Sequence, residues 1–578
     1  MKKIIALALA LIMILGLATT ASAEGEVTEP TATTYSITIN NSKPGHIYEA
    51  YQIFTGDLFV TGEGENISKV LSNIAWGSGI TAEGKAKLGN AETVAKSLEN
   101  EADAIAFSKN AALYLSNVVA GSDNAPEDDK YVIDIEEPGY YLVKDQNNSL
   151  NGENDVYTRY IVKVVGEAVV SPKSSAPSVQ KKVDDINDSN TTEDEVEWKD
   201  SADHDITDHV PFQLKATLGT TVEDYLKYKV VFHDTLSKGM YYDQGSYEVY
   251  LGEGENRKKV TEHFKINVGE YSETTGTEIT FTCENVKAFG ATNSSVIVVE
   301  YTATLNDKAN IGAPGNPNEV YLEYSNNPNW AWEKWGDSNG DGIIDENDEP
   351  TVPPTNPGDD GKDNDNDDKI DEDDEDWDEP TGNTPVDKVI VFTYKVSVDK
   401  VNEANAALPG AEFTLEKFVA SENGTTTFKG VKGDWVTKTL VKNADGTVFS
   451  FEGMDDGEYR ITETKAPAGY NSVAPIYFKV EATHTLDAAE PKLESLTVTV
   501  TKEDGTAYTE AEMVSGNIAN FDVTLTDGQM KTTVVNKAGV ELPETGGMGT
   551  TLFYIIGGLL VAGAAILLIT KKRMSANY

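Results

Sequence analysis

Alternation of apolar and polar residues over most of the chain is the feature that most constrains its fold. Short alternating runs separated by turn residues occupy residues 178–329 and return over residues 389–536. Successive residues of a strand face opposite sides of a sheet, so each run would bury one face and expose the other. The pattern predicts tandem immunoglobulin-like β-sandwiches in a mainly β protein.

A third unit is predicted before these two sandwiches, and a helical insertion distinguishes it from them. Strand-like sequences open this unit at residues 35–40 and close it at residues 157–170. Between them, residues 82–119 carry spaced Ala, Leu and Val among Lys and Glu, a spacing typical of helices. The first domain is therefore expected to be mostly β, with helices inserted between its strands.

The N-terminus carries the features of an export signal. Lys2 and Lys3 precede an apolar stretch that is too short for an ordinary membrane anchor. Ala21, Ser22 and Ala23 then supply the small residues of a signal-peptidase site. These features predict that residues 1–23 form a signal peptide, that the mature chain begins near Glu24, and that the protein is exported.

The C-terminus carries an apolar segment followed by basic residues. Residues 552–569 contain no charge, and Lys571, Lys572 and Arg573 follow them. As a helix the apolar run would measure about 27 Å, close to the hydrocarbon thickness of a bilayer. The basic residues would stay in the cytoplasm, which places the preceding chain outside the cell. A C-terminal transmembrane helix is therefore predicted at residues 551–570.

Composition limits the possible binding partners and the kinds of cross-link that can stabilise the domains. A formal net charge of −49 argues against nucleic acid and anionic lipid as partners. The single cysteine, Cys283, excludes an intrachain disulfide although the protein is exported. Cys283 alternates with Ile279 and Phe281, which predicts a core residue rather than a reactive thiol. Another kind of cross-link is expected if the domains bear load.

Changes in composition divide the chain into segments. These are a signal peptide 1–23, an N-terminal domain 24–170, a linker 171–177, a middle sandwich 178–394, a C-terminal sandwich 395–540 and a tail 541–578. Within the middle sandwich, residues 333–385 are predicted to be an acidic insertion that precedes its last strand. The reason is that residues 337–379 hold 20 Asp or Glu residues against two Lys residues.

Two stretches of the acidic insertion have the ligand spacing of calcium loops. The predicted ligands are Asp337, Asn339, Asp341, Ile343, Asp345 and Asp348 in the first loop, and Asp363, Asp365, Asp367, Asp371 and Asp374 in the second. Gly342 occupies the sharp turn of the first loop, whereas Asp368 stands at that position in the second, which predicts a weaker site. Ca²⁺ is the expected cofactor, and an acidic spacer without bound metal is the alternative.

One lysine of the last domain falls on the apolar face of a predicted strand. Tyr394, Val396, Val398 and Lys400 share one parity, so Lys400 would point into the core with its apolar neighbours. A lone buried ammonium is energetically expensive.

Three separated motifs of this last domain resemble the collagen-adhesin B-type domain. They are residues 408–415, a glutamate-centred box at residues 459–470, and residues 534–537 at the end of the last strand. The resemblance implies an intramolecular isopeptide bond between Lys400 and Asn536, promoted by Glu463. Burial would lower the pKa of the lysine and raise that of the glutamate, so that a neutral amine attacks an amide polarised by a protonated acid. A buried Lys–Glu pair beside a hydrogen-bonded Asn is the alternative.

The middle domain resembles the fimbrial isopeptide-forming domain of pilins, through residues 179–183, 232–239 and 315–328. The resemblance implies that Lys181 is the amine, Asn318 the amide and Asp234 the acid. Lys182, Asp208 and Asn316 remain alternatives, because paired residues of one type blur the register. Each bond is expected to tie the first strand of its sandwich to the last. The first domain is expected to lack such a bond, because its opening strand has no lysine and Lys43 lies in a polar turn.

The tail resembles the sorting signal that sortase transpeptidases recognise on Gram-positive surface proteins. The motif consists of Leu542, Pro543, Glu544, Thr545 and Gly546, and the apolar and basic segments follow it. Residues 45–54 in turn resemble the opening of the N-terminal domain of sortase-assembled major pilins. In that family a linker lysine attacks the acyl-enzyme formed at the threonine of the next subunit. Lys173 is the expected lysine here, although Ser replaces both the aromatic residue before the proline and the Asn after the lysine.

These features together predict a structural protein, the shaft subunit of a covalent pilus anchored to the cell wall. The expected partners are pilus-specific and housekeeping sortases, identical subunits, minor pilins, peptidoglycan and host surface ligands. A monomeric wall-anchored adhesin with the same domains is the alternative function. No enzymatic activity is expected beyond isopeptide formation in the chain itself, because the sequence lacks metal-spaced His residues, a Gly-x-Ser-x-Gly elbow and a phosphate loop.

Overall fold

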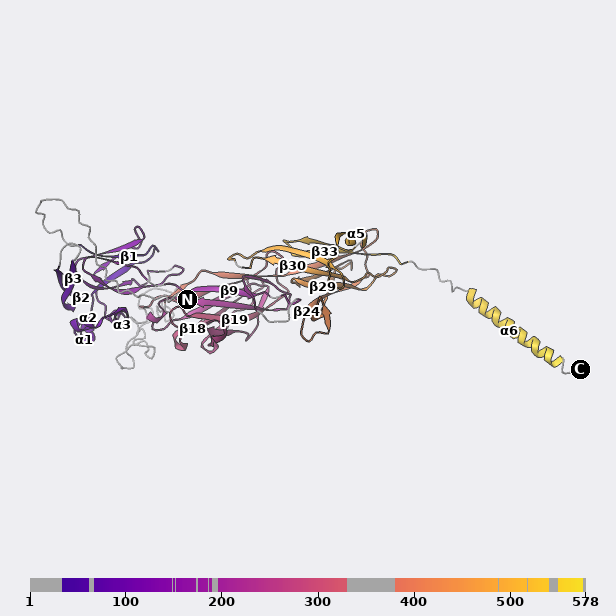
Figure 1. Ribbon diagram of the computed structural model, residues 1–578, viewed down its shortest axis with the longest axis horizontal. Helices are drawn as coiled ribbons and strands as arrows, with labels where there is room; N and C mark the ends of the chain where they lie inside the picture. The colour runs from indigo at the N-terminus through magenta and orange to yellow at the C-terminus, as the bar shows by residue number, and fades with distance from the viewer. Residues whose placement is uncertain are drawn as a thin grey trace, which may run out of the picture.

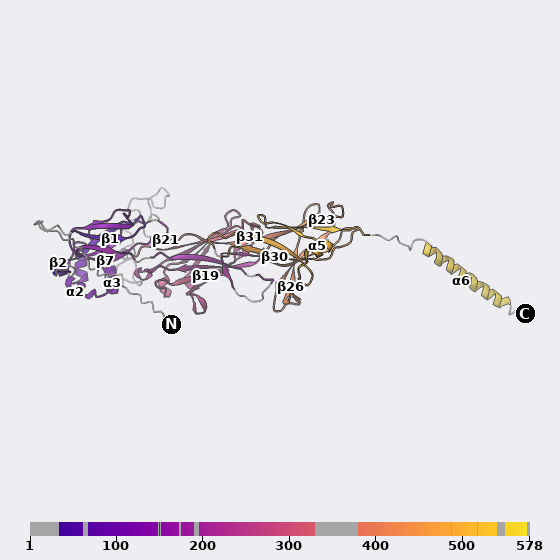
Figure 2. The same cartoon turned by 45° about the horizontal axis from the view of Figure 1, so that its top comes forward.

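The computed structural model shows three β-rich units that follow one another along the long axis of the molecule, with helix α6 beyond them (Figure 1). A second view shows the same linear order (Figure 2). The described residues are 34–61, 67–147, 149–150, 152–172, 175–185, 187–189, 196–329, 380–486, 488–516, 518–539 and 549–574. Strands dominate these residues, which confirms the predicted mainly β fold class.

The N-terminal domain contains two sheets and a helical layer. One sheet has the order β5-β1-β8, and the other has the order β3-β2-β6-β7 with β4 beside β2. The strands are β1 (Tyr35–Asn40), β2 (Tyr48–Thr61), β3 (Ser68–Trp76), β4 (Ala120–Gly121), β5 (Lys130–Ile135), β6 (Gly139–Asp145), β7 (Arg159–Val164) and β8 (Glu167–Val170). Strand β2 contributes Ala50 to the core between the sheets and Phe54 to a second core under the helices, so both faces of its sheet are covered.

The predicted helical insertion consists of three helices, α1 (Ala82–Leu88), α2 (Ala91–Ser97) and α3 (Glu101–Ala112). Each helix begins after a residue whose side chain accepts a hydrogen bond from the first turn, namely Thr81, Asn90 and Asn100. Residues 113–119 do not continue the last helix, so the helical part is shorter than the predicted 82–119.

The middle sandwich packs two seven-stranded sheets around one core. One sheet has the order β10-β9-β12-β19-β15-β16 with β14 beside β19, and the other has the order β11-β22-β20-β13-β18-β17 with β21 beside β20. The strands are β9 (Ser178–Asp184), β10 (Trp198–Lys199), β11 (Ser201–Asp203), β12 (His209–Thr217), β13 (Val230–Leu236), β14 (Met240–Tyr242), β15 (Glu248–Leu251), β16 (Lys258–Lys259), β17 (Lys265–Val268), β18 (Thr277–Cys283), β19 (Val296–Leu305), β20 (Asn316–Ser325), β21 (Thr381–Asn383) and β22 (Asp387–Phe392). Cys283 lies in this core, where burial raises the pKa of its thiol to about 11.

Strand β22 returns the chain to the middle sandwich after the acidic segment. It pairs antiparallel with β20 and parallel with β11. Thr393 alone separates β22 from the first strand of the next sandwich, which begins at Tyr394, one residue before the predicted boundary.

The C-terminal sandwich packs a five-stranded sheet, β27-β28-β23-β33-β32, against a six-stranded sheet, β25-β26-β24-β29-β30-β31. Its elements are β23 (Tyr394–Asn402), β24 (Glu412–Ala420), β25 (Thr426–Phe428), β26 (Val431–Thr439), β27 (Val441–Lys442), β28 (Val448–Met454), β29 (Gly457–Lys465), β30 (Ile476–His484), β31 (Leu493–Thr501), α5 (Glu510–Gly516), β32 (Phe521–Thr524) and β33 (Gln529–Asn536). The first strand, β23, and the last, β33, are parallel neighbours.

Helix α6 (Gly549–Met574) contains the predicted transmembrane segment. Its stretch Tyr554–Lys572 is long and apolar enough to cross a membrane, with a mean hydropathy of 2.0. No part of this stretch is buried against the sandwiches. An unburied apolar helix of this length is what a bilayer-spanning anchor requires.

Candidate isopeptide sites

Lys400 and Asn536 lie side by side on the parallel strands β23 and β33. Lys400 is paired with Val534, and Asn536 follows Val534 by two residues, so both side chains enter the same face of the sheet. Both residues have no exposed surface. The Nζ atom of Lys400 donates hydrogen bonds to the backbone carbonyl oxygens of Val534 at 3.0 Å and Val401 at 3.2 Å.

Glu463 reaches this pair from strand β29 of the facing sheet. The Nδ2 atom of Asn536 donates to both carboxylate oxygens of Glu463, each at 3.0 Å. The backbone N–H of Val473 donates to the Oε2 atom at 3.0 Å and so fixes the carboxylate. Burial lowers the pKa of Lys400, while the charge of Glu463 opposes that shift. The site therefore brings together an amine with weakened basicity, an amide and a carboxyl group.

The middle sandwich brings a similar set together across its two sheets. Lys181 comes from β9 in one sheet, whereas Asp234 and Asn318 come from β13 and β20 in the other. All three residues have no exposed surface. Lys181 forms an ion pair with the Oδ2 atom of Asp234. The same face of the second sheet carries both the acid and the amide, because Asn318 pairs with Leu236, two residues from Asp234.

Tyr301 of strand β19 connects the three groups. Its hydroxyl donates to the Oδ1 atom of Asp234 at 2.8 Å and accepts from the Nδ2 atom of Asn318 at 2.7 Å. The Nζ atom of Lys181 lies 3.3 Å from the same hydroxyl oxygen. Tyr301 was absent from the predicted site, since its alternation with apolar neighbours resembles that of any core aromatic residue. Its hydroxyl therefore holds the side chains of Asp234 and Asn318 relative to each other.

Burial shifts the pKa values of the middle site toward neutral groups. It lowers the pKa of Lys181 and raises that of Asp234, and the mutual attraction of the two charges only partly opposes each shift. A neutral amine beside a protonated acid is the state in which the amine can act as a nucleophile.

The alternative residues do not converge on this site. Lys182 faces outward to Asp200, 2.5 Å away. The side-chain amide of Asn316 is engaged by Asn310 and by the carbonyl oxygen of Val391. Asp208 instead lies 3.8 Å from the Nδ1 atom of His204. The geometry therefore favours Lys181, Asp234 and Asn318 among the combinations that the sequence left open.

One expectation about the middle pair is wrong. Asn318 lies on β20, which is not the last strand, because β22 follows it in the same sheet. The pair therefore joins the two sheets of the sandwich rather than its first and last strands. In the C-terminal sandwich, by contrast, Lys400 and Asn536 do lie on the first and last strands.

Several predicted sites lie outside the described residues. They are the signal peptide, the linker residue Lys173, the sorting motif Leu542–Gly546 and both calcium loops, residues 337–348 and 363–374. Their predicted roles therefore rest on the sequence.

Three family models match separate parts of the chain. Residues 206–328 match the Gram-positive pilin backbone subunit 2, Cna-B-like domain, and residues 394–492 match a prealbumin-like fold domain. Residues 534–575 match the LPXTG cell wall anchor motif. The anchor match and the apolar helix fit a surface protein held at the cell wall, as predicted.

The chain is also similar to individual pilus proteins. It is 24% identical to the trypsin-resistant surface T6 protein of Streptococcus pyogenes serotype M6 over 477 residues, which cover 74% of each chain. The solved T6 backbone pilin superposes with a TM-score of 0.46 and 17% identity over 89% of this chain and 100% of that one. The major pilin SpaD of Corynebacterium diphtheriae gives a TM-score of 0.42 and 15% identity over 88% of this chain and 98% of that one.

Proposed function

We propose that this chain is the shaft subunit of a covalent surface pilus, polymerised head to tail by sortases and stabilised by two internal Lys–Asn isopeptide bonds. The observation that carries the proposal is the pair of buried Lys, acid and Asn sets in consecutive sandwiches. The matches to a pilin backbone domain and to a cell wall anchor motif support it. A protein without disulfides gains from such bonds the covalent reinforcement that an extracellular shaft requires.

The chemistry of each bond follows from the groups present. The neutral Nζ atom of the lysine attacks the Cγ atom of the asparagine, while a protonated carboxyl group donates to the amide oxygen and stabilises the charge that develops there. The C–N bond to the Asn nitrogen breaks, the proton lost by the amine goes to that nitrogen, and ammonia leaves. Glu463 and Asp234 are regenerated as protonated acids, so each acts once without being consumed.

The amide of Asn536 must turn before it reacts. Its Nδ2 atom faces Glu463 in the present arrangement, whereas the reaction requires the oxygen there. The two ends of an amide exchange places by a half-turn about the side-chain bond. When Glu463 is protonated it has a hydrogen to donate, which favours the orientation with the oxygen toward it.

Polymerisation would use one group in the linker after the N-terminal domain and one in the C-terminal sorting motif. A pilus-specific sortase would cleave between Thr545 and Gly546 and hold Thr545 as an acyl-enzyme, and the amine of Lys173 on another subunit would release it as an amide. A housekeeping sortase would attach the last subunit to peptidoglycan, and minor pilins would join the same polymer. The chemistry requires an accessible primary amine in a short extended linker, which residues 171–177 provide by composition.

Calcium binding by the acidic insertion is a second part of this proposal. Its support is the spacing of carboxylates in the sequence of residues 337–348, and more weakly of residues 363–374. Bound Ca²⁺ would relieve the repulsion among these closely spaced carboxylates.

Tandem mass spectrometry of wall-released material tests the polymerisation directly. The expected finding is a branched peptide in which the carboxyl group of Thr545 is joined to the Nζ atom of Lys173. The Lys173→Ala variant should lose the high-molecular-weight ladder, whereas Lys182→Ala, on a nearby strand, should keep it. Monomeric wall-linked protein in the wild type would support the adhesin function instead.

A further inference from the structure

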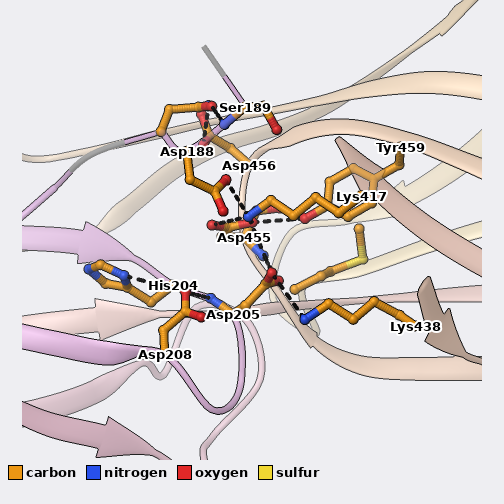
Figure 3. Close-up of polar contacts among 12 residues, drawn as sticks. Asp188, Ser189, His204, Asp205, Asp208, Lys417, Lys438, Asp455, Asp456 and Tyr459 are labelled. Atoms are coloured by element: carbon orange, nitrogen blue, oxygen red, sulfur yellow. Dashed lines mark hydrogen bonds and ion pairs between the residues drawn. The ribbon is translucent and has the colours of Figure 1, made fainter. Parts of the chain in front are cut away.

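The junction between the middle and C-terminal sandwiches contains a third fully buried lysine, Lys417 of strand β24 (Figure 3). Its Nζ atom lies 2.6 Å from the Oδ1 atom of Asp455, 2.7 Å from the Oδ1 atom of Asp188 and 3.2 Å from the Oδ2 atom of Asp205. The side chains of Asp205 and Asp455 are 4% exposed, whereas that of Asp188 is 39% exposed. One ammonium thus contacts three carboxylates, two of them buried.

These carboxylates come from both sandwiches. Asp188 follows β9 and Asp205 follows β11 in the middle sandwich, whereas Asp455 lies between β28 and β29 of the C-terminal sandwich. Lys438 of β26 adds a weaker contact to Asp205 at 3.6 Å. Lys417 therefore binds its own domain and the neighbouring one at the same time.

Hydrogen bonds hold the two sandwiches together around this cluster. The hydroxyl of Ser189 donates to the carbonyl oxygen of Phe418 at 2.6 Å, and the N–H of Ile206 donates to the carbonyl oxygen of Gly453 at 3.0 Å. A Cβ atom at Gly453 would lie 2.2 Å from Ile206, and one at Gly457 would lie 2.6 Å from the hydroxyl oxygen of Ser189. Only glycine allows this close approach, so the interface is tightly packed.

Counting charges shows that the cluster is not electrically balanced. Lys417 and the more distant Lys438 supply two positive charges, yet three carboxylates, those of Asp188, Asp205 and Asp455, surround Lys417. An uncompensated carboxylate is very costly away from water, so it takes up a proton instead. The hydroxyl of Tyr459 donates to the Oδ1 atom of Asp455 at 2.8 Å, which adds a partner but no positive charge.

We propose that the Lys417 cluster is a proton-linked clamp between the two sandwiches. When the junction closes, Lys417 binds carboxylates from both domains and the surplus carboxylates take up protons. The middle and C-terminal sandwiches then behave as one rigid segment, although neither isopeptide bond crosses the junction. Closure is favoured by mild acid and weakened as the medium becomes alkaline.

The titratable groups around the clamp support this direction. The titratable groups in or beside the clamp are Lys417, Lys438, His204, Tyr459, Asp185, Asp188, Asp203, Asp205, Asp208, Asp455 and Asp456. His484 and Lys199 lie beside Asp185, and Glu458 is paired with Lys429. Burial raises the pKa of Asp455, and repulsion from Asp205 raises it further. Burial also raises the pKa of Asp456 to about 6.

The sign of the pH dependence follows from proton counting. A carboxyl group with a raised pKa binds more protons in the closed state than in the open one, so closure weakens as pH rises through the raised value. His204 acts in the same sense. Burial lowers the pKa of its imidazole, but the interactions with Asp208, the backbone of Asp184 and Asp203 together raise it. The pKa of Asp208 is lowered, so this group acts in the opposite sense, but only in stronger acid. Burial lowers the pKa of His484, so this group opposes the trend near neutral pH.

Hydrogen exchange of the purified full-length chain in detergent tests the clamp. In Lys417→Met, amide exchange in residues 203–208 and 453–458 should accelerate by at least about tenfold, which reports local opening of the junction. Asp205→Asn, which alters only the middle-domain side, should accelerate the same segments. Lys442→Met, at an exposed position on β27, should change neither segment.

Exchange in the core strands β12 and β33 shows whether each sandwich remains folded. If Lys417→Met also accelerates exchange in β33, the Asp205→Asn variant is the deciding test. Unchanged exchange of residues 203–208 and 453–458 in Asp205→Asn would then overturn the clamp. In the wild type, protection of the junction should fall from about pH 5 to about pH 8 after correction for the intrinsic exchange rate. Protection that stays constant, or that rises over this range, overturns the proton linkage.

Discussion

Lys181 and Lys417 are both fully buried lysines, yet their surroundings give them opposite chemistry. Lys181 meets one carboxylate, that of Asp234, and the rings of Phe212 and Tyr301 at 5.5 Å. Burial lowers its pKa more than that single carboxylate raises it. Lys417 meets three carboxylates, whose combined attraction exceeds the effect of burial and holds its pKa well above the usual range. One neighbouring carboxylate thus leaves a buried lysine with a lowered pKa, whereas three carboxylates raise the pKa and keep the lysine charged.

The largest effect is expected when the acid of an isopeptide site is removed. In Glu463→Gln, Lys400 and Asn536 remain adjacent but lose the proton donor, so the bond should not form and the intact mass should rise by one ammonia. The unfolding free energy of the C-terminal sandwich should fall by about 5 kcal/mol, the value that loop-closure entropy gives for a cross-link across such a long loop.

Glu412→Gln is the matched control, because that glutamate lies on the same sandwich with a 53% exposed side chain. It should change neither the mass nor the stability measurably. A Glu463→Gln protein that still lacks two ammonia molecules would remove Glu463 from the mechanism.

A smaller effect is expected when the positioning residue of the middle site is changed. Tyr301→Phe removes the hydroxyl that binds both Asp234 and Asn318, and bond formation should slow by about tenfold to a hundredfold, as for the loss of a positioned hydrogen-bonding group. Mass spectra taken at intervals after refolding should show both linked and unlinked protein. Tyr242→Phe, on β14 in the same core, should form the bond at the wild-type rate.

A smaller effect still is expected on the pH dependence of the clamp. Burial raises the pKa of Asp456 to about 6, so Asp456→Asn should remove one source of proton uptake on closure. The loss of junction protection with rising pH should become shallower, by up to one proton per molecule, while the linked masses stay unchanged. An identical pH slope in the variant and the wild type would exclude Asp456 as a contributor.

Calcium is expected to have the smallest effect on the isopeptide sites and on the Lys417 clamp. Calorimetry should show heat on adding Ca²⁺ to the full-length chain, and the heat should be reduced in Asp341→Asn. Chelation should leave the linked masses and the junction exchange unchanged, because no predicted calcium ligand belongs to the isopeptide sites or to the Lys417 cluster. No heat in the wild type would exclude the calcium sites.

Strand alternation predicted that Lys400 lies in the core, and the resemblance to the collagen-adhesin B-type domain supplied Asn536 and Glu463 as its partners. The middle site stayed ambiguous until the register showed that Lys181, and not Lys182, points inward. The same alternation applied to Phe413, Leu415 and Lys417 would have marked Lys417 as a buried residue. Its partners could not be predicted, since Asp205 lies 212 residues away in sequence and belongs to another domain.

Intact mass spectrometry of the purified wild-type chain tests the central claim most directly, that the two buried Lys, acid and Asn sets close into covalent bonds. The expected mass is lower than the calculated mass of the same chain by two ammonia molecules. Peptide mapping should assign these losses to Lys181–Asn318 and Lys400–Asn536. A protein at its full calculated mass would contradict the account.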